Sequence, residues 1–360
     1  MSDALLQDLR GQLAVGDVVA VVGAGLSLSA TGNAEVASWT GLLRSGVKYC
    51  QDIAHVDDEW ARRAREDIDS GDMDGILSTA EKLTNKLGGN SGPEFRRWLE
   101  ETVGRLEPSA SDTLRALKDL EIPIVTTNYD SLIEQVTGRA PVTWKESWRV
   151  QEVLRGKDDA IVHLHGYWQK PESVVLGIRS YDEILGSDIQ ELLRALVAMK
   201  CMLLIGFGAG LQDPNFSPLR NWMAASYGRS SFRHFRLYCQ AESSAVQGMH
   251  DDAERVALIS YGVDHNDLVQ FLRQLGVTTR AAALTSPPPR DDHPQPWPAL
   301  PPTTGRMVER ATAEAASKLL LLRNLETLIT PDVYKEKLNQ IINQAIDSLG
   351  EGKRERSSGR

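Results

Sequence analysis

Six short runs of consecutive apolar residues, many of them β-branched, recur along the first three quarters of the chain. They cover residues 17–22, 122–127, 160–164, 201–205, 235–239 and 256–261. Runs this short and this apolar are typical of strands that are buried on both faces of a parallel sheet. Helical patterns lie between the runs, and an alternation of strands with helices predicts a doubly wound parallel sheet. The pattern therefore predicts an α/β fold.

Four of these runs end at turns that contain glycine or asparagine. The turns are Gly23-Ala24-Gly25, Asn128-Tyr129-Asp130, His165-Gly166 and Gly206-Phe207-Gly208. Ligands of open α/β sheets bind outside the carboxyl ends of the strands, and parallel strands end at one common edge. We therefore expect the four turns to surround a single crevice.

Residues 44–120 have a different pattern, in which apolar residues recur at helical spacing among many charges. Ser91-Gly92-Pro93-Glu94 marks a helix start, with proline in the first turn and an acidic residue near the positive end of the helix dipole. The pattern predicts an all-helical insertion between the first two strands. Such an insertion can act as a lid over the crevice or serve only as structural support.

The C-terminal part has its own organisation. Eight of the nineteen residues from 286 to 304 are proline, which predicts a semi-extended linker after a domain that covers residues 1–285. Residues 305–350 regain helical periodicity, and Pro331 separates two helices. A hairpin of this size buries its apolar stripe poorly alone, so we expect it to pair with copies of itself or to dock elsewhere. Residues 351–360 are expected to be a disordered tail.

The composition excludes several classes of protein. With 41% hydrophobic and 25% charged residues the chain is typical of soluble globular proteins, and it has no apolar run long enough for a membrane span. Residues 1–16 predict an amphipathic helix instead of a targeting signal, so we expect a cytoplasmic protein. The net charge of −9 argues against nucleic acid as a direct ligand.

The three cysteines form no C-x-x-C pair, which argues against a disulfide framework and against a four-thiolate zinc site. These cysteines are Cys50, Cys201 and Cys239. We therefore expect no metal.

The first turn has the chemistry of a phosphate site. Glycines at 23 and 25 allow a pyrophosphate to approach the backbone, and the amides at the start of the next helix can donate to it. The turn lacks the third glycine of the dinucleotide fingerprint, and glycine can also be needed there for packing alone. Gly206-Phe207-Gly208 can likewise take a distal ribose and phosphates or be an ordinary loop.

Two polar side chains at strand ends are the candidates for catalysis. Asn128 can orient a water molecule, although Asp130 in the same turn can simply cap the next helix. His165 can act as an acid–base group near neutral pH, although a lone histidine is often structural. His163 faces the same side of its strand but lies deeper, so we assign it a structural role.

Taken together, these four motifs and Asp213-Pro214 resemble the sirtuin superfamily, and more closely its bacterial branch of NAD-degrading effectors of antiphage defence. The resemblance covers about residues 1–280 and implies a Rossmann-like domain that takes NAD+ as its substrate. It implies that Asn128 and His165 form the catalytic pair. The residues that it implies for NAD+ binding are Gly23, Ala24, Gly25, Ser27, Thr127, Asp130, Gly206, Gly208, Asp213 and Tyr261.

The chain departs from deacylating sirtuins at two places. It lacks the four cysteines of their zinc module, and residues 44–120 lack the usual cofactor loop after the first motif. Both departures favour simple cleavage of NAD+ to nicotinamide and ADP-ribose. The sequence does not decide between linear and cyclic ADP-ribose as the product.

Other functions stay open at this point. A protein deacylase or an ADP-ribosyltransferase can use the same fold, and so can a non-catalytic sensor of NAD or an ADP-ribose derivative that signals by assembly. A dehydrogenase is disfavoured because the glycine fingerprint is incomplete. The C-terminal hairpin resembles short C-terminal (SHOCT) oligomerisation domains, which implies a homo-oligomer. The expected partners are NAD+, further copies of the chain and a partner defence protein.

Overall fold

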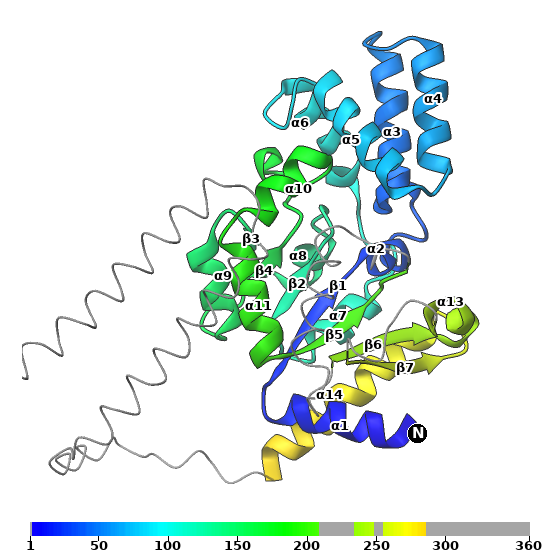
Figure 1. Ribbon diagram of the computed structural model, residues 1–360. Coiled ribbons are helices and arrows are strands. Elements are labelled where there is room, and N and C mark those ends of the chain that lie inside the picture. Colours follow the sequence, from blue (N-terminus) through cyan, green and yellow to red (C-terminus); the bar gives the residue numbers. More distant parts are fainter. Residues whose placement is uncertain (1, 209–233, 248–254, 286–360) are drawn as a thin grey trace, which may run out of the picture. The chain divides into compact units, whose positions relative to one another are not determined.

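The computed structural model describes residues 2–208, 234–247 and 255–285 (Figure 1). Its centre is a seven-stranded sheet in the order β3-β4-β2-β1-β5-β6-β7, and every pair of neighbouring strands is parallel. The strands are β1 (Val18–Val22), β2 (Ile124–Thr126), β3 (Pro141–Thr143), β4 (Ile161–His163), β5 (Cys201–Ile205), β6 (His234–Cys239) and β7 (Val256–Gly262). The predicted α/β fold with a parallel sheet is confirmed.

Six of these strands correspond to the six apolar runs, and the seventh, β3, was not predicted. Its sequence, Pro141-Val142-Thr143, is too short to give a recognisable apolar run. It lies at the edge of the sheet and begins with proline, which edge strands tolerate because they need fewer backbone donors. The expectation of six strands was therefore wrong by one edge strand.

Helices cover both faces of the sheet. The helices of the described residues are α1 (Ser2–Ala14), α2 (Ala24–Ala30), α3 (Trp39–Asp52), α4 (Asp58–Asp69), α5 (Met73–Lys86), α6 (Pro93–Glu101), α7 (Asp112–Lys118), α8 (Leu132–Thr137), α9 (Ser147–Leu154), α10 (Ile178–Leu185), α11 (Ile189–Met199), α13 (Ser243–Gln247) and α14 (Asp267–Thr285). Short 3₁₀ helices are η1 (Glu35–Ala37), η2 (Val103–Arg105), η3 (Pro171–Ser173) and η5 (Gln240–Glu242).

Strand β1 contributes to two separate hydrophobic cores, because successive side chains of a strand point to opposite faces. Val18, Ala20 and Val22 pack in the core formed with α1, α7, α8 and α14. Val19 and Val21 pack in the core formed with α9, α10 and α11. All five residues are buried, which explains why this strand has no polar positions.

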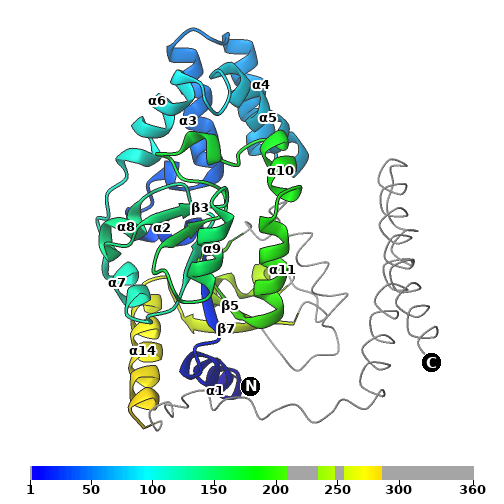
Figure 2. The same ribbon diagram turned by 90° about the vertical axis from the view of Figure 1, so that its left-hand side faces the viewer.

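The chain between β1 and β2, all of it described, contains helices and no strand, which confirms the predicted helical insertion. Side-chain oxygens cap the start of three of its helices, since the backbone N–H groups of Gly41, Trp60 and Gly75 donate to Ser38, Asp57 and Asp72. Helix α6 begins at the predicted Pro93. Residues 1–287 form one compact unit. Figures 1 and 2 show α3 to α6 together at one end of this unit, with α1 and α14 at the other end.

The C-terminal predictions fall outside the described residues. This applies to the proline-rich linker 286–304, the hairpin 305–350 and the tail 351–360, and also to Asp213. Within the described part of the chain, none of the helices has the length and apolar character needed to span a membrane.

The buried His234 at the start of β6 should make stability depend on pH. Its Nδ1 accepts a hydrogen bond from the backbone N–H of Met202, and burial lowers the pKa of His234 from 6.5 to about 4. Above pH 6.5 the ring is neutral in both states, whereas between pH 6.5 and 4 the unfolded chain binds a proton that the folded chain excludes. This difference should lower the free energy of unfolding by about 3 kcal/mol as the pH falls to 4.

Urea unfolding at several pH values measures this effect, with His234→Asn as the matched control. The asparagine oxygen can still accept from Met202 but does not titrate, so the variant should lose less stability between pH 6.5 and 4. Equal pH dependence of the two proteins would contradict the prediction.

Candidate functional site

The four turns start at the same level of the sheet. The pairing register places Val22 beside both Thr126 and Ile205, and Thr126 beside His163. The residues that follow these positions line one cleft of about 930 Å³, which is large enough for a small-molecule ligand. The expectation that the turns surround a single crevice is confirmed.

Most of the predicted site residues line this cleft. They are Gly23, Ala24, Gly25, Thr127, Asn128, Asp130, His165, Gly206, Gly208 and Tyr261. Ser27 is buried and is not among the residues that line the cleft, so any contact with NAD+ stays a prediction. The roles of all these residues toward a ligand stay predictions.

The helical insertion forms a wall of the same cleft. The lining includes Trp39 and Arg44 from α3, Asp69 at the end of α4 and Met73 from α5, together with Tyr181 from α10. Arg44 is the one lysine or arginine among the described lining residues, and its guanidinium lies 2.7 Å from the Asp69 carboxylate. The insertion therefore contributes to the site and is more than structural support. The sequence indicated the helices but not which faces of them line the cleft.

The first and fourth turns pack directly against each other. The backbone N–H of Gly25 donates to the carbonyl of Gly206 over 2.9 Å. A Cβ atom at Gly23 or Gly25 would lie 2.8 Å from that carbonyl oxygen, closer than such contacts allow, and Gly206 has φ +73°. Glycine is thus needed here for packing, whatever the ligand, while the backbone of both turns still lines the cleft.

A buried network fixes the side chain of Asn128. Its Nδ2 donates to the carbonyl of Gly23 over 3.1 Å and to Ser27 Oγ over 2.8 Å. Ser27 Oγ in turn donates to Asp130 Oδ2 over 2.7 Å, and Asp130 Oδ1 accepts from the backbone N–H of Leu132 over 3.0 Å. Burial raises the pKa of the Asp130 carboxyl group, and the two donors oppose that rise. Asp130 therefore accepts from the first residue of α8 and also orients Asn128 through Ser27.

The atom of Asn128 that remains for a ligand is Oδ1. Both Nδ2 hydrogens have acceptors, and no donor among the described residues reaches Oδ1. This oxygen can accept a hydrogen bond from a water molecule or a hydroxyl group, and its partial negative charge can stabilise a nearby cation.

His165 is 4% exposed and lines the cleft beside Tyr181, whose ring it meets edge to face with 5.8 Å between centroids. The chain then turns sharply at Gly166, which has φ +87°, and a Cβ there would lie 2.2 Å from the carbonyl oxygen of Ser173. The carbonyl of His165 accepts from the backbone N–H of Val175 over 2.8 Å. Glycine after the histidine is therefore required for the path that places the ring in the cleft.

A buried arginine supports the fourth turn. Arg236 on β6 is fully buried, and its Nη2 donates to the carbonyls of Phe207 and Gly208 over 2.6 and 3.2 Å. This residue was not predicted from the sequence. The available signal was a charged residue inside the otherwise apolar run 235–239.

Polar groups gather around Tyr261 at the end of the cleft that β7 borders. The hydroxyl group of Tyr261 lies 2.9 Å from His265 Nδ1, and burial raises the pKa of Tyr261. Glu242 and Asp264 line the same part of the cleft. These carboxylates and the tyrosine can bind hydroxyl groups of a sugar. Of these residues, only Tyr261 was predicted from the sequence.

A comparison with protein families matches residues 123–265 to the SIR2-like domain. The matched segment begins just before β2 and ends just after β7, so it contains Asn128, His165 and the fourth turn but not the first turn. The match agrees with the sirtuin resemblance over this segment and with the parallel sheet. It indicates an NAD-related activity.

Proposed function

We propose that the protein is an NAD+ glycohydrolase. In this reaction water replaces nicotinamide at the C1′ atom of the ribose, which gives nicotinamide, ADP-ribose and a proton. The observation that carries the proposal is that Asn128 and His165 line the same cleft as the two glycine turns. The SIR2-like match supports NAD+ as the substrate.

The residues suit the demands of this chemistry. Nicotinamide leaves as a neutral molecule, so the leaving group needs no strong acid, whereas the ribose becomes an oxocarbenium-like cation. Oδ1 of Asn128 can stabilise that cation or hold the attacking water, because its direction is fixed by Gly23 and Ser27. His165 can accept a proton from the water or from a ribose hydroxyl group.

Several features favour hydrolysis over protein deacylation. The three cysteines are buried in α3, β5 and β6 and are not grouped, so the described part of the chain contains nothing like the zinc module of deacylating sirtuins. The helices of the insertion also occupy one wall of the cleft.

Incubation of the full chain with NAD+, with and without an acylated peptide, tests the proposal. Chromatography would measure nicotinamide, ADP-ribose and cyclic ADP-ribose. Without peptide, we expect the amount of nicotinamide to equal the summed amounts of linear and cyclic ADP-ribose. Release of nicotinamide only with peptide would indicate a deacylase instead, and binding of NAD+ without turnover would indicate a sensor.

We further propose that the enzyme is an effector of antiviral defence that acts as a homo-oligomer through residues 305–350. Its sequence resemblance to NAD-degrading defence effectors and to SHOCT hairpins supports this. Light scattering should give a multiple of the chain mass for the full protein and a smaller mass for residues 1–304. An unchanged oligomeric state after truncation would contradict the proposed role of the hairpin.

A further inference from the structure

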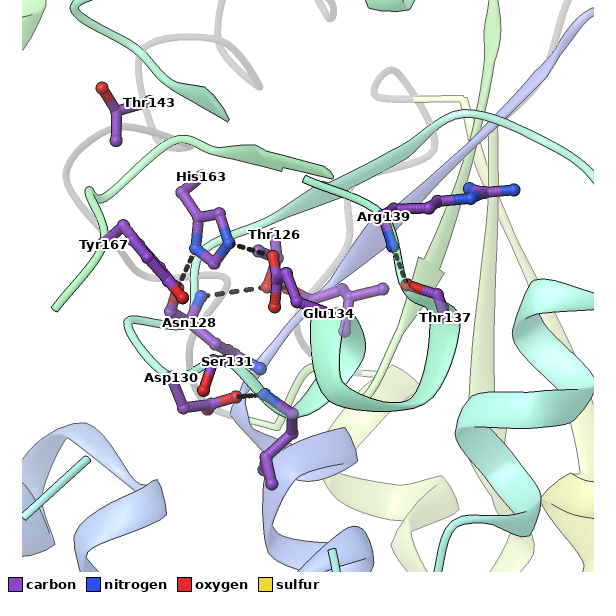
Figure 3. A network of polar contacts seen from close by, with 12 residues as sticks. Thr126, Asn128, Asp130, Ser131, Glu134, Thr137, Arg139, Thr143, His163 and Tyr167 are labelled. Atoms are coloured by element: carbon purple, nitrogen blue, oxygen red, sulfur yellow. Dashed lines mark hydrogen bonds and ion pairs between the residues drawn. The ribbon is translucent and has the colours of Figure 1, made fainter. Parts of the chain in front are cut away.

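A fully buried histidine lies directly behind the candidate catalytic asparagine. His163, the last residue of β4, has its Nδ1 2.8 Å from the main-chain oxygen of Asn128 and its Nε2 2.6 Å from Oε1 of Glu134 on α8 (Figure 3). The ring of Tyr167 packs against it, with 4.8 Å between centroids. His163 does not line the cleft and cannot touch a ligand there.

The partners of His163 determine where its proton lies. A main-chain carbonyl can only accept a hydrogen bond, so Nδ1 must carry a hydrogen. Nε2 and the Glu134 carboxyl group then share one further proton, and the pair is neutral as a whole. The Glu134 side chain is only 9% exposed, and its second oxygen is buried without a hydrogen-bond partner among the described residues. His163 is therefore the hydrogen-bond partner on which this carboxyl group depends.

The other main-chain groups of the turn are held by different means. The N–H of Asn128 donates to Thr126 Oγ1 over 3.0 Å, and the carbonyl of Tyr129 accepts from the N–H of Trp168 over 3.0 Å. The carbonyl of Asn128 accepts instead from a side chain of another strand, through His163 Nδ1. The direction of this carbonyl is set by the ψ angle of Asn128, so the bond to His163 also fixes the path of the turn.

We propose that His163 and Glu134 are positioning residues for Asn128. Glu134 holds the histidine with a hydrogen on Nδ1, and His163 holds the main-chain carbonyl of Asn128. The Asn128 amide then stays directed at Gly23 and Ser27, with Oδ1 left for the substrate. This inference rests on the proposed NAD+ hydrolysis.

Two substitutions of His163 each keep one of its two hydrogen bonds, to the Asn128 carbonyl or to Glu134, and lose the other. The amide nitrogen in His163→Asn can take the place of Nδ1 and still donate to the Asn128 carbonyl, but it cannot reach Glu134. The longer side chain in His163→Gln can reach toward Glu134 in place of Nε2, but it leaves the carbonyl without its donor. Both variants replace a buried ring by a neutral amide, so each is the matched control of the other.

We expect kcat of His163→Gln to fall about 100-fold, because a small displacement of an oriented group costs this much. His163→Asn should stay within about 10-fold of the wild type, and KM should change little in both, since the interaction lost acts on the reaction step. Glu134→Gln should also stay within about 10-fold, because its amide can donate to Nε2 and keep the hydrogen on Nδ1. Thermal unfolding of all three variants checks that they are folded.

Two kinetic outcomes would overturn the inference. One is wild-type kcat in His163→Gln, and the other is an equal loss of kcat in His163→Asn and His163→Gln that follows their melting temperatures, as a purely structural role requires. Nitrogen-15 NMR of the histidine rings gives a readout that does not depend on turnover. The His163 Nδ1 should carry a hydrogen in the wild type, and an unprotonated Nδ1 would also overturn the inference.

Failure of the proposed function gives a different result. A wild-type protein that does not hydrolyse NAD+ would remove the glycohydrolase, while the NMR measurement would still decide whether His163 donates to the Asn128 carbonyl.

Discussion

Asn128→Ala is expected to lower the rate of NAD+ hydrolysis by about 10²–10⁴-fold, the range for loss of a positioned catalytic group. The alanine removes Oδ1, the one polar atom of this side chain that the protein leaves for a substrate. It also removes the donor to Ser27, although Ser27 keeps its own bond to Asp130. Steady-state kinetics of nicotinamide release would measure the loss.

The control for this variant is Asn85→Ala. Asn85 is an exposed residue of α5 whose amide contacts Glu81 on the same helix, and it does not line the cleft. The same chemical change there should leave kcat unaltered. Circular dichroism should show that Asn128→Ala remains folded, and full activity in that variant would defeat the assignment of Asn128.

His165→Ala is expected to cause a loss of similar size, about 10²–10⁴-fold in kcat, because it removes the proposed proton acceptor. The side chain lies in the cleft beside Tyr181, so its removal leaves space next to the reacting groups. Added imidazole should therefore restore part of the activity if the ring acts as a base. Nicotinamide release with and without imidazole measures both effects.

A merely structural histidine would behave differently at this position. His165→Ala would then lower the melting temperature while kcat stayed near the wild-type value, which would contradict the proposed role. His55→Ala serves as the control, since His55 is exposed in the insertion and does not line the cleft. It should leave kcat unaltered.

The sheet and the position of the site could be predicted from the sequence because both depend on local patterns. Buried parallel strands are continuously apolar, and Val18–Val22 is the clearest case because it packs in two cores. Once the strands are parallel, their carboxyl ends share an edge, and the turns after them must meet. The edge strand β3 was missed because three residues that begin with proline carry almost no pattern.

The hydrogen-bond partners of the site side chains could not be predicted, because these bonds join segments that are far apart in the sequence. Ser27 meets Asp130 across 103 positions of the chain and accepts from Asn128 across 101. The resemblance implies that Ser27 binds NAD+, and the contacts between segments add that it joins the first turn to the second. Arg44 and Tyr181 were missed for a related reason, since helical periodicity gives the buried face of a helix but not the neighbour that it meets.

The contact between Gly25 and Gly206 changes how relatives of this protein should be compared. These glycines are confined by the neighbouring backbone, so a descendant that had lost its catalytic ability would still need them in order to fold. Their presence in another chain is thus a sign of shared architecture, and it says little about whether that chain is active. Asn128 and His165 carry the proposed chemistry, so they are the positions to compare when the activity of another chain is in question.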